Sequence, residues 1–201
     1  MIRLEPPTHS LPPPATVARR LGAFAVDYLL ISLYIGLLVL ASLTLGPEVG
    51  SEALFADPLR GQLASAALLT LPVVLYFALM ESSSRGATVG KRVVGIQVRA
   101  SKGPAAGRRL PLARSLVRSA LKFAPWEIAH TSLWRLPGWP GEVETVPWGV
   151  ALGFALTWVL GGLYLAFPLL SRRRQTPYDR AAGSVVVRTP VTDPAPGRRP
   201  A

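Results

Sequence analysis

The chain has 201 residues, 50% of them hydrophobic, and a formal net charge of +11. Only 16% of the residues are charged, against about 25% in typical soluble domains, which indicates a protein that lies in lipid. The chain has no cysteine, which excludes disulfides and cysteine-based metal sites or nucleophiles, and its two histidines are too few for an all-histidine metal site. A positive charge of this size is also typical of nucleic-acid-binding proteins. The distribution of the charge along the chain must therefore distinguish a membrane protein from a nucleic-acid-binding protein.

The chain begins with a proline-rich arm, residues 1–18, which we expect to be disordered. Three later segments are apolar and long enough to cross a bilayer, which takes about 20 residues. They are residues 22–45, which carry the single charge of Asp27, and residues 62–80 and 147–170, which carry none. The first segment is too long for the core of a signal peptide, and we therefore interpret it as an uncleaved span.

Residues 112–134 form an ambiguous fourth segment. Arg114, Arg118 and Lys122 repeat every four residues along it and share one helical face, and hydropathy alone would place such a helix at the membrane surface. The positive-inside rule favours a fourth span. With four crossings, every basic segment is cytoplasmic, and the two acidic loops, residues 46–61 and 135–146, are external.

We therefore predict an all-α integral membrane protein of the cell membrane, with about four transmembrane helices, three of them clear, and both termini cytoplasmic. The positive charge is spread over segments next to the spans, which indicates contact with the bilayer and its anionic lipids and argues against a nucleic-acid partner. Two short β-branched segments, Lys91–Arg99 and Ser184–Arg188, are expected to pair as a small cytoplasmic β element. The transmembrane domain then covers residues 19–188, followed by a disordered tail over residues 189–201.

The glycine-rich segment Gly86–Arg92 superficially resembles a phosphate-binding loop. Only three residues separate its glycines, and Arg92 stands where Ser or Thr should follow the lysine, which excludes that motif. The segment is interpreted instead as a cytoplasmic turn that enters a strand, with Thr88, Gly90 and Lys91 as its defining residues.

Asp27 is the most informative residue, because a charge inside a span costs about 2.5–3.5 kcal/mol unless it has a partner or water. Arg114 or Arg118 is expected to pair with it and to hold two helices together, and Lys122 and Arg20 are further candidate cations. An ion-binding or proton-carrying role for Asp27 is the alternative. Glu127 and His130, at i and i+3, form a second candidate proton pair, against the simpler interpretation that both are solvated near the outer interface. No catalytic constellation, metal site or cofactor site is predicted, and the chain is not expected to be an enzyme.

Four segments in order resemble the RDD family of membrane proteins: RLGAFAVD (Arg20–Asp27), GATVGKRVVGIQV (Gly86–Val98), the Arg114/Arg118 helix, and QTPYDRAAGSVVV (Gln175–Val187). The family is named for one arginine and two aspartates, which the resemblance places at Arg20, Asp27 and Asp179. The chain departs from the pattern in Ser184, where the family usually has threonine, and in an added stretch, PWEIAHTSLWR.

The resemblance implies a multi-span protein with a transport or transport-associated role, for which cation/proton exchange has been proposed in some members. The alternative is a non-transporting scaffold or accessory protein that binds other membrane components. A four-span protomer is small for a transporter, and a transport role therefore implies a homo-oligomer. The GxxxG of Gly149 and Gly153 lets helix backbones approach closely, either inside the protomer or at a homodimer face.

The topology can be tested by cysteine labelling, because the chain has no native cysteine. Single cysteines at Gly138 and at Ser171 should label from opposite sides of the membrane if residues 112–134 cross it. Labelling of both from one side would contradict the four-span arrangement.

Overall fold

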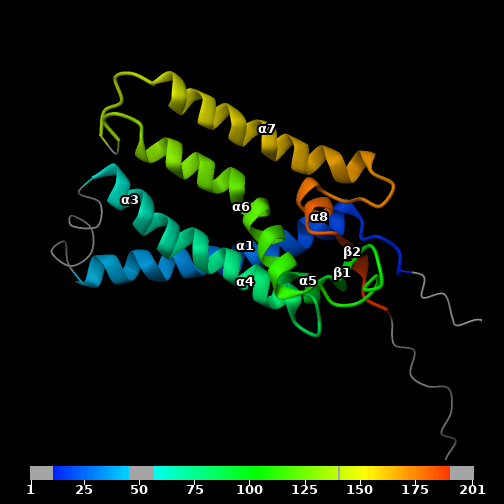
Figure 1. The fold of residues 1–201 in the computed structure, drawn as a ribbon. Coiled ribbons are helices and arrows are strands. Elements are labelled where there is room, and N and C mark those ends of the chain that lie inside the picture. The colour runs from blue at the N-terminus through cyan, green and yellow to red at the C-terminus, as the bar shows by residue number, and fades with distance from the viewer. Residues whose placement is uncertain (1–10, 46–56, 140, 191–201) are drawn as a thin grey trace, which may run out of the picture.

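The computed structural model describes residues 11–45, 57–139 and 141–190. Four helical rods lie side by side, each antiparallel to the next along the chain (Figure 1). The rods are α1 (Val17–Leu45); the continuous run of α3 (Pro58–Ser65), the π-helix η1 (Ala66–Thr70) and α4 (Leu71–Ser82); α6 (Leu112–Trp134); and α7 (Trp148–Leu170).

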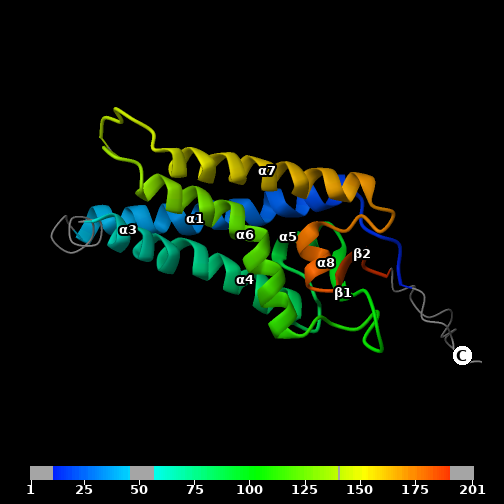
Figure 2. The same ribbon diagram turned by 45° about the horizontal axis from the view of Figure 1, so that its top comes forward.

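Three of the rods, Val17–Leu45, Pro58–Ser82 and Trp148–Leu170, are long and apolar enough to cross a membrane, judged by length and composition. The three clear spans are therefore confirmed. The fourth rod, α6, is 23 residues long, the same length as α7. It packs against both α4 and α7 and runs from one end of the bundle to the other (Figures 1 and 2).

The remaining elements gather at one end of the rods, which we call the sheet end (Figure 2). They are α5 (Val89–Val93), β1 (Ile96–Ala100), α8 (Pro177–Ala181) and β2 (Ser184–Arg188). Strand β1 pairs antiparallel with β2, with Ile96 opposite Arg188 and Ala100 opposite Ser184. The predicted pairing of the two segments is confirmed.

The strand predicted over Lys91–Arg99 is wrong in its first part, because Lys91–Val93 belongs to the helix α5. Thr88 caps that helix: its hydroxyl accepts a hydrogen bond from the Lys91 amide. Gly95 then adopts a φ of +68°, a conformation that favours glycine, and turns the chain into β1. The expected simple turn into a strand is thus a capped helical turn followed by a strand.

Part of the proline-rich arm is ordered, contrary to expectation. The Ala15 amide donates to the Val186 carbonyl at 2.9 Å, the Arg188 amide donates to the Pro13 carbonyl at 3.1 Å, and Ala15 is fully buried. The arm therefore lies along β2 before α1 begins at Val17. The outer parts of the two predicted disordered ends, residues 1–10 and 191–201, lie outside the described residues.

The small apolar core lies at the sheet end, and most large side chains of the rods face outward. The core consists of Ala15, Ala23, Ile96, Val98, Ala100, Leu110 and Val186. By contrast, Leu33, Leu43 and Trp158 on the rods are 62%, 76% and 81% exposed. Outward-facing leucine and tryptophan are the expected surface of helices that contact lipid rather than water.

The surroundings of Gly153 and Gly138 affect two expectations from the sequence, the role of the GxxxG and the choice of labelling position. A Cβ at Gly153 would lie 2.0 Å from the Ser132 hydroxyl oxygen, and this end of the GxxxG therefore packs inside the protomer, against α6. A Cβ at Gly138, where φ is +84°, would lie 1.9 Å from the Glu142 carbonyl oxygen. Because a cysteine there would distort the loop, the exposed Glu144 is the better external labelling position.

Candidate functional site

Asp179 joins the C-terminal helix α8 to two of the rods. Within α8 it forms a capping box with Thr176, in which each side chain accepts a hydrogen bond from the other residue's amide. Its carboxylate also accepts from Arg20 of α1 and from Arg118 of α6, each at 2.9 Å, and it is fully buried. Burial alone would raise the pKa of this carboxyl, but Arg118 and Arg20 outweigh it and lower the pKa from 3.8 to about 2.

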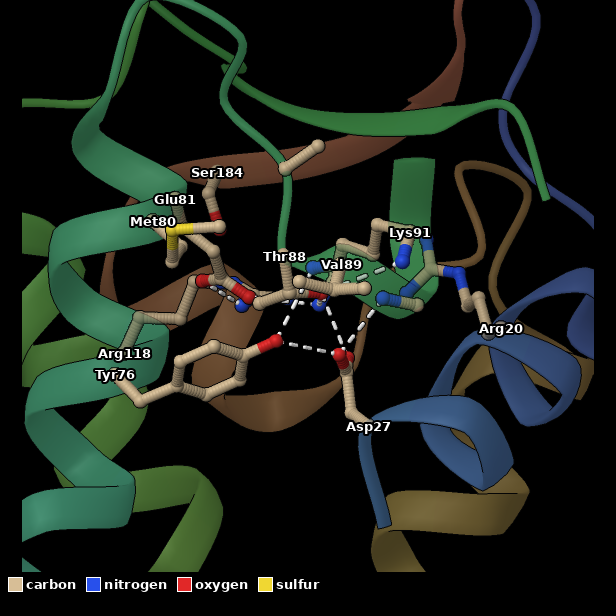
Figure 3. A network of polar contacts seen from close by, with 12 residues as sticks. Arg20, Asp27, Tyr76, Met80, Glu81, Thr88, Val89, Lys91, Arg118 and Ser184 are labelled. Carbon is tan, nitrogen blue, oxygen red and sulfur yellow. Dashed lines mark hydrogen bonds and ion pairs between the residues drawn. The ribbon is translucent and has the colours of Figure 1, made fainter. Parts of the chain in front are cut away.

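Arg118 extends the network to a second buried carboxylate. Its guanidinium pairs with Asp179 on one side and with Glu81, at the end of α4, on the other. Glu81 in turn pairs with Lys91 of α5 at 2.8 Å. All four groups are at least nine-tenths buried. Because an isolated buried charge is costly, each member holds the others in place. Figure 3 shows Glu81, Lys91 and Arg118 extending toward one another from separate elements.

Asp27 sits beside this network with its own set of donors. Its carboxylate accepts hydrogen bonds from the Tyr76 hydroxyl at 2.9 Å, the Thr88 hydroxyl at 2.6 Å and the Gly90 amide at 2.8 Å (Figure 3). It therefore ties α1 to α4 and to the start of α5. Asp27 is fully buried, and its donors come from neutral groups.

The expected ion pair between Asp27 and Arg114 or Arg118 is therefore wrong. Arg118 binds Glu81 and Asp179, and Arg114 is exposed on the outer side of α6 near Gly183. The expectation failed because helical spacing places three cations on one face without showing which of them turns inward. Asp179, the third residue of the family signature, caps α8, and ion pairs through Arg118, Glu81 and Lys91 connect it to the Gly86–Arg92 segment.

Glu127 occupies a different place, more than a helical turn along α6 from this network. Its carboxylate accepts a hydrogen bond from Thr70 in the π-helix at 2.6 Å. Within the described part of the chain, no cationic group lies within ion-pair distance of it. His130 stacks on Trp126, with ring centroids 4.4 Å apart, and its Nδ1 lies 3.1 Å from the Trp126 carbonyl oxygen. Glu127 and His130 thus share a face of α6, but each has its own partner.

Sequence reasoning missed Glu81 and Tyr76, and it did not predict the surroundings of Lys122. Glu81 is fully buried between two cations. Tyr76 donates to Asp27, and Lys122 lies over the ring of Phe77 with its ammonium 3.5 Å from the centroid. The signal for Glu81 was present: a carboxylate ends an uncharged span ten residues before a lysine. Within the described residues, no group of three or more His, Asp or Glu side chains is arranged to hold a metal ion.

The rods and the buried ion pairs at the sheet end define a multi-span membrane protein whose helices are joined at one end by charges. The family model of the RDD family matches residues 14–183, and the chain belongs to that family. No curated protein and no solved structure matches the chain in the corresponding searches. The three residues taken as the family signature, Arg20, Asp27 and Asp179, lie within the matched range and are joined to the same end of the bundle.

Gly90 offers a test of the contact between α1 and α5. A Cβ at this position would lie 2.0 Å from the Ala23 carbonyl oxygen and 2.9 Å from the Asp27 carboxyl carbon. Gly90→Ala should therefore separate α5 from α1 and cost about 1–3 kcal/mol of stability. The matched control is Gly162→Ala in α7, where a Cβ meets nothing within 4 Å. Thermal unfolding in detergent measures both, and equal melting temperatures for the two variants would contradict the close contact.

The lowered pKa of Asp179 predicts how stability depends on pH. Because the folded-state pKa lies below the usual 3.8, at about 2, its contribution is present above pH 3.8 and is lost as the pH falls toward 2. A shift of this size corresponds to on the order of 2 kcal/mol. Melting temperatures measured from pH ~5 to pH ~2 should fall less steeply for Asp179→Asn than for the wild type. Identical slopes would show that Asp179 is not held ionised by its arginines.

Proposed function

We propose that the protein crosses the cell membrane four times, with the sheet end and both termini in the cytoplasm. The chain leaves α4 at the sheet end and enters α7 at the opposite end, and α6 connects the two. If α4 and α7 span the bilayer, α6 must cross the same thickness. Supporting the orientation, arginines are concentrated at the sheet end, including Arg172, Arg173 and Arg174, whereas the loop before α7 carries Glu142 and Glu144.

We further propose a transport role, with exchange of a cation for a proton as the reaction class and Glu127 as the proton-binding group. The observation that carries this proposal is the contrast between the carboxylates of the rods. Glu81 is held by two cations and Asp27 by three hydrogen-bond donors, whereas Glu127 has the single Thr70 hydroxyl. A carboxyl group without a counter-ion can gain or lose a proton without breaking an ion pair.

The surroundings of Glu127 support the same role. It lines a cavity of about 360 Å³ between α6 and α7, together with the hydroxyls of Thr131 and Ser132. Its partner Thr70 belongs to a π-helical turn, and such turns occur frequently at functional sites. Pro125, two residues earlier in α6, removes a backbone hydrogen bond near the same depth, and its carbonyl accepts from Thr157 of α7 at 3.3 Å.

A non-transporting accessory role is the second candidate, and a different observation favours it. Arg20, Asp27 and Asp179 are all engaged in contacts that join helices. If these signature residues define the family, its members share a structural framework. Sharing that framework does not imply that they transport the same ion. In this interpretation the outward-facing helical surfaces serve to bind other membrane components.

Proton movement in proteoliposomes distinguishes the two candidates. Purified wild-type protein should move protons in response to a gradient of Na⁺, K⁺ or Li⁺, and Glu127→Gln should reduce that movement to the level of protein-free liposomes. Glu144→Gln is the matched control, because Glu144 is exposed in the loop before α7. An absence of response to all three cations in the wild type would favour the accessory role, and a fully active Glu127→Gln variant would remove Glu127 from the mechanism.

A further inference from the structure

A cavity of about 260 Å³ opens at the sheet end between α1 and α7. Four cationic side chains line it, together with aromatic and aliphatic groups. The cationic residues are Arg20, Lys91, Arg118 and Lys122, and the others include Phe24, Tyr164, Tyr178, Leu21, Leu165 and Pro168. This cavity is separate from the one beside Glu127, which α6 and the start of α7 form nearer the opposite end.

The charges around the cavity do not balance. The four cationic side chains face three buried carboxyl groups, those of Asp27, Glu81 and Asp179. Arg20 and Arg118 share Asp179, and Arg118 and Lys91 share Glu81. The remaining carboxyl, Asp27, is occupied by its three neutral donors. Lys122 is therefore the basic residue of this cavity that has no carboxylate partner among the described residues.

Lys122 is enclosed by aromatic rings rather than by acceptors. Its ammonium lies 3.5 Å from the ring centroid of Phe77, 5.2 Å from that of Phe24 and 5.1 Å from that of Phe123. Across residues 11–45, 57–139 and 141–190, no carboxylate lies within ion-pair distance of this ammonium. The rings attract the cation, and within the described residues no oxygen accepts a hydrogen bond from its N–H groups.

Arg20 lines the same cavity and also has donors without an acceptor. Its Nη1 binds Asp179, but its Nε and Nη2 are buried and have no hydrogen-bond partner in the described part of the chain. Buried donors without acceptors are rare, and each such group calls for an explanation. An anion in this cavity would lie beside both Arg20 and Lys122 and would bring oxygen acceptors and negative charge to this cluster of cationic residues.

We propose that this cavity binds the phosphate of an anionic phospholipid, with the acyl chains lying against α1 and α7. Leu21 of α1 and Leu165 of α7 line the cavity and are 50% and 57% exposed, and the opening is therefore bordered by lipid-facing leucines. The cavity lies at the end of the rods, where the phosphate layer of a bilayer falls. Its volume is below the roughly 300–1,000 Å³ of pockets that enclose whole drug-sized ligands, which suits a headgroup with its chains outside.

The inference does not depend on transport, and lipid binding can be measured on the same purified protein without any flux. We expect phosphatidylglycerol to raise the melting temperature of detergent-solubilised wild type and native mass spectrometry to show one retained lipid, with phosphatidylcholine giving neither effect. Lys122→Gln should remove both effects. Arg114→Gln should keep both, because Arg114 lies on α6 two turns before Lys122 but points outward.

A second variant keeps the test decisive if Lys122→Gln does not fold. Leu165→Trp places a larger side chain at the opening of the cavity, on a position already exposed to lipid. It should melt like the wild type without lipid and should lose the phosphatidylglycerol effect.

Three results would overturn the proposal. Equal stabilisation by phosphatidylcholine and phosphatidylglycerol, or a phosphatidylglycerol effect that survives both Lys122→Gln and Leu165→Trp, would show that this cavity does not select an anionic headgroup. Inorganic phosphate that stabilises lipid-free protein as strongly as phosphatidylglycerol would assign the cavity to a soluble anion instead.

Discussion

Arg118 lies at the centre of the network because one guanidinium holds two buried carboxylates from different parts of the chain. Glu81 comes from α4 and Asp179 from α8, and neither can be solvated by water or by lipid at its position. Removing one partner from such a set leaves a buried charge uncompensated, which is far more costly than the pair is favourable. The ion pairs are therefore complete only when α4, α6 and α8 are all packed together.

This constraint explains how the elements at the sheet end pack in one defined arrangement although the apolar core is small. The rods expose their leucines, and packing between helices in lipid gains little from the hydrophobic effect. The charges and hydrogen bonds supply the missing specificity at the sheet end. Asp27 places α5 against α1, and the Thr176–Asp179 capping box fixes α8 immediately before β2.

Much of this architecture could be predicted from the sequence. The spans followed from hydropathy, and β1 and β2 were found because β-branched residues are concentrated in two short segments. The connections inside the site could not be predicted in the same way. Spacing along α6 places Arg114, Arg118 and Lys122 on one face, but the packing of α4 and α8 selects Arg118 as the partner of both carboxylates, whereas Lys122 lies against Phe77 and Arg114 is exposed. That selection depends on contacts between residues far apart in the chain.

The same limit explains the error about Asp27. A lone carboxylate in an apolar span was expected to find a cation, because cations were the evident partners in the sequence. Its donors are instead a tyrosine, a threonine and a backbone amide. A backbone N–H has no sequence signature, and Gly90 reaches Asp27 only because it lacks a side chain. The buried carboxylates thus differ in kind: some are held by cations, and this one is held by neutral groups.

That difference between Asp27 and the carboxylates held by cations can be tested with one measurement. The melting temperatures of Asp27→Asn and Asp179→Asn should be compared in detergent near neutral pH. Asparagine at position 27 keeps one oxygen that accepts from the Tyr76 hydroxyl and the Gly90 amide, and its NH2 group can donate to the Thr88 hydroxyl. Asparagine at position 179 leaves Arg20 and Arg118 without the charge that compensates them. The account predicts the larger loss for Asp179→Asn. An equal or larger loss for Asp27→Asn would contradict it, because Asp27 would then carry the ionic contact that joins the helices.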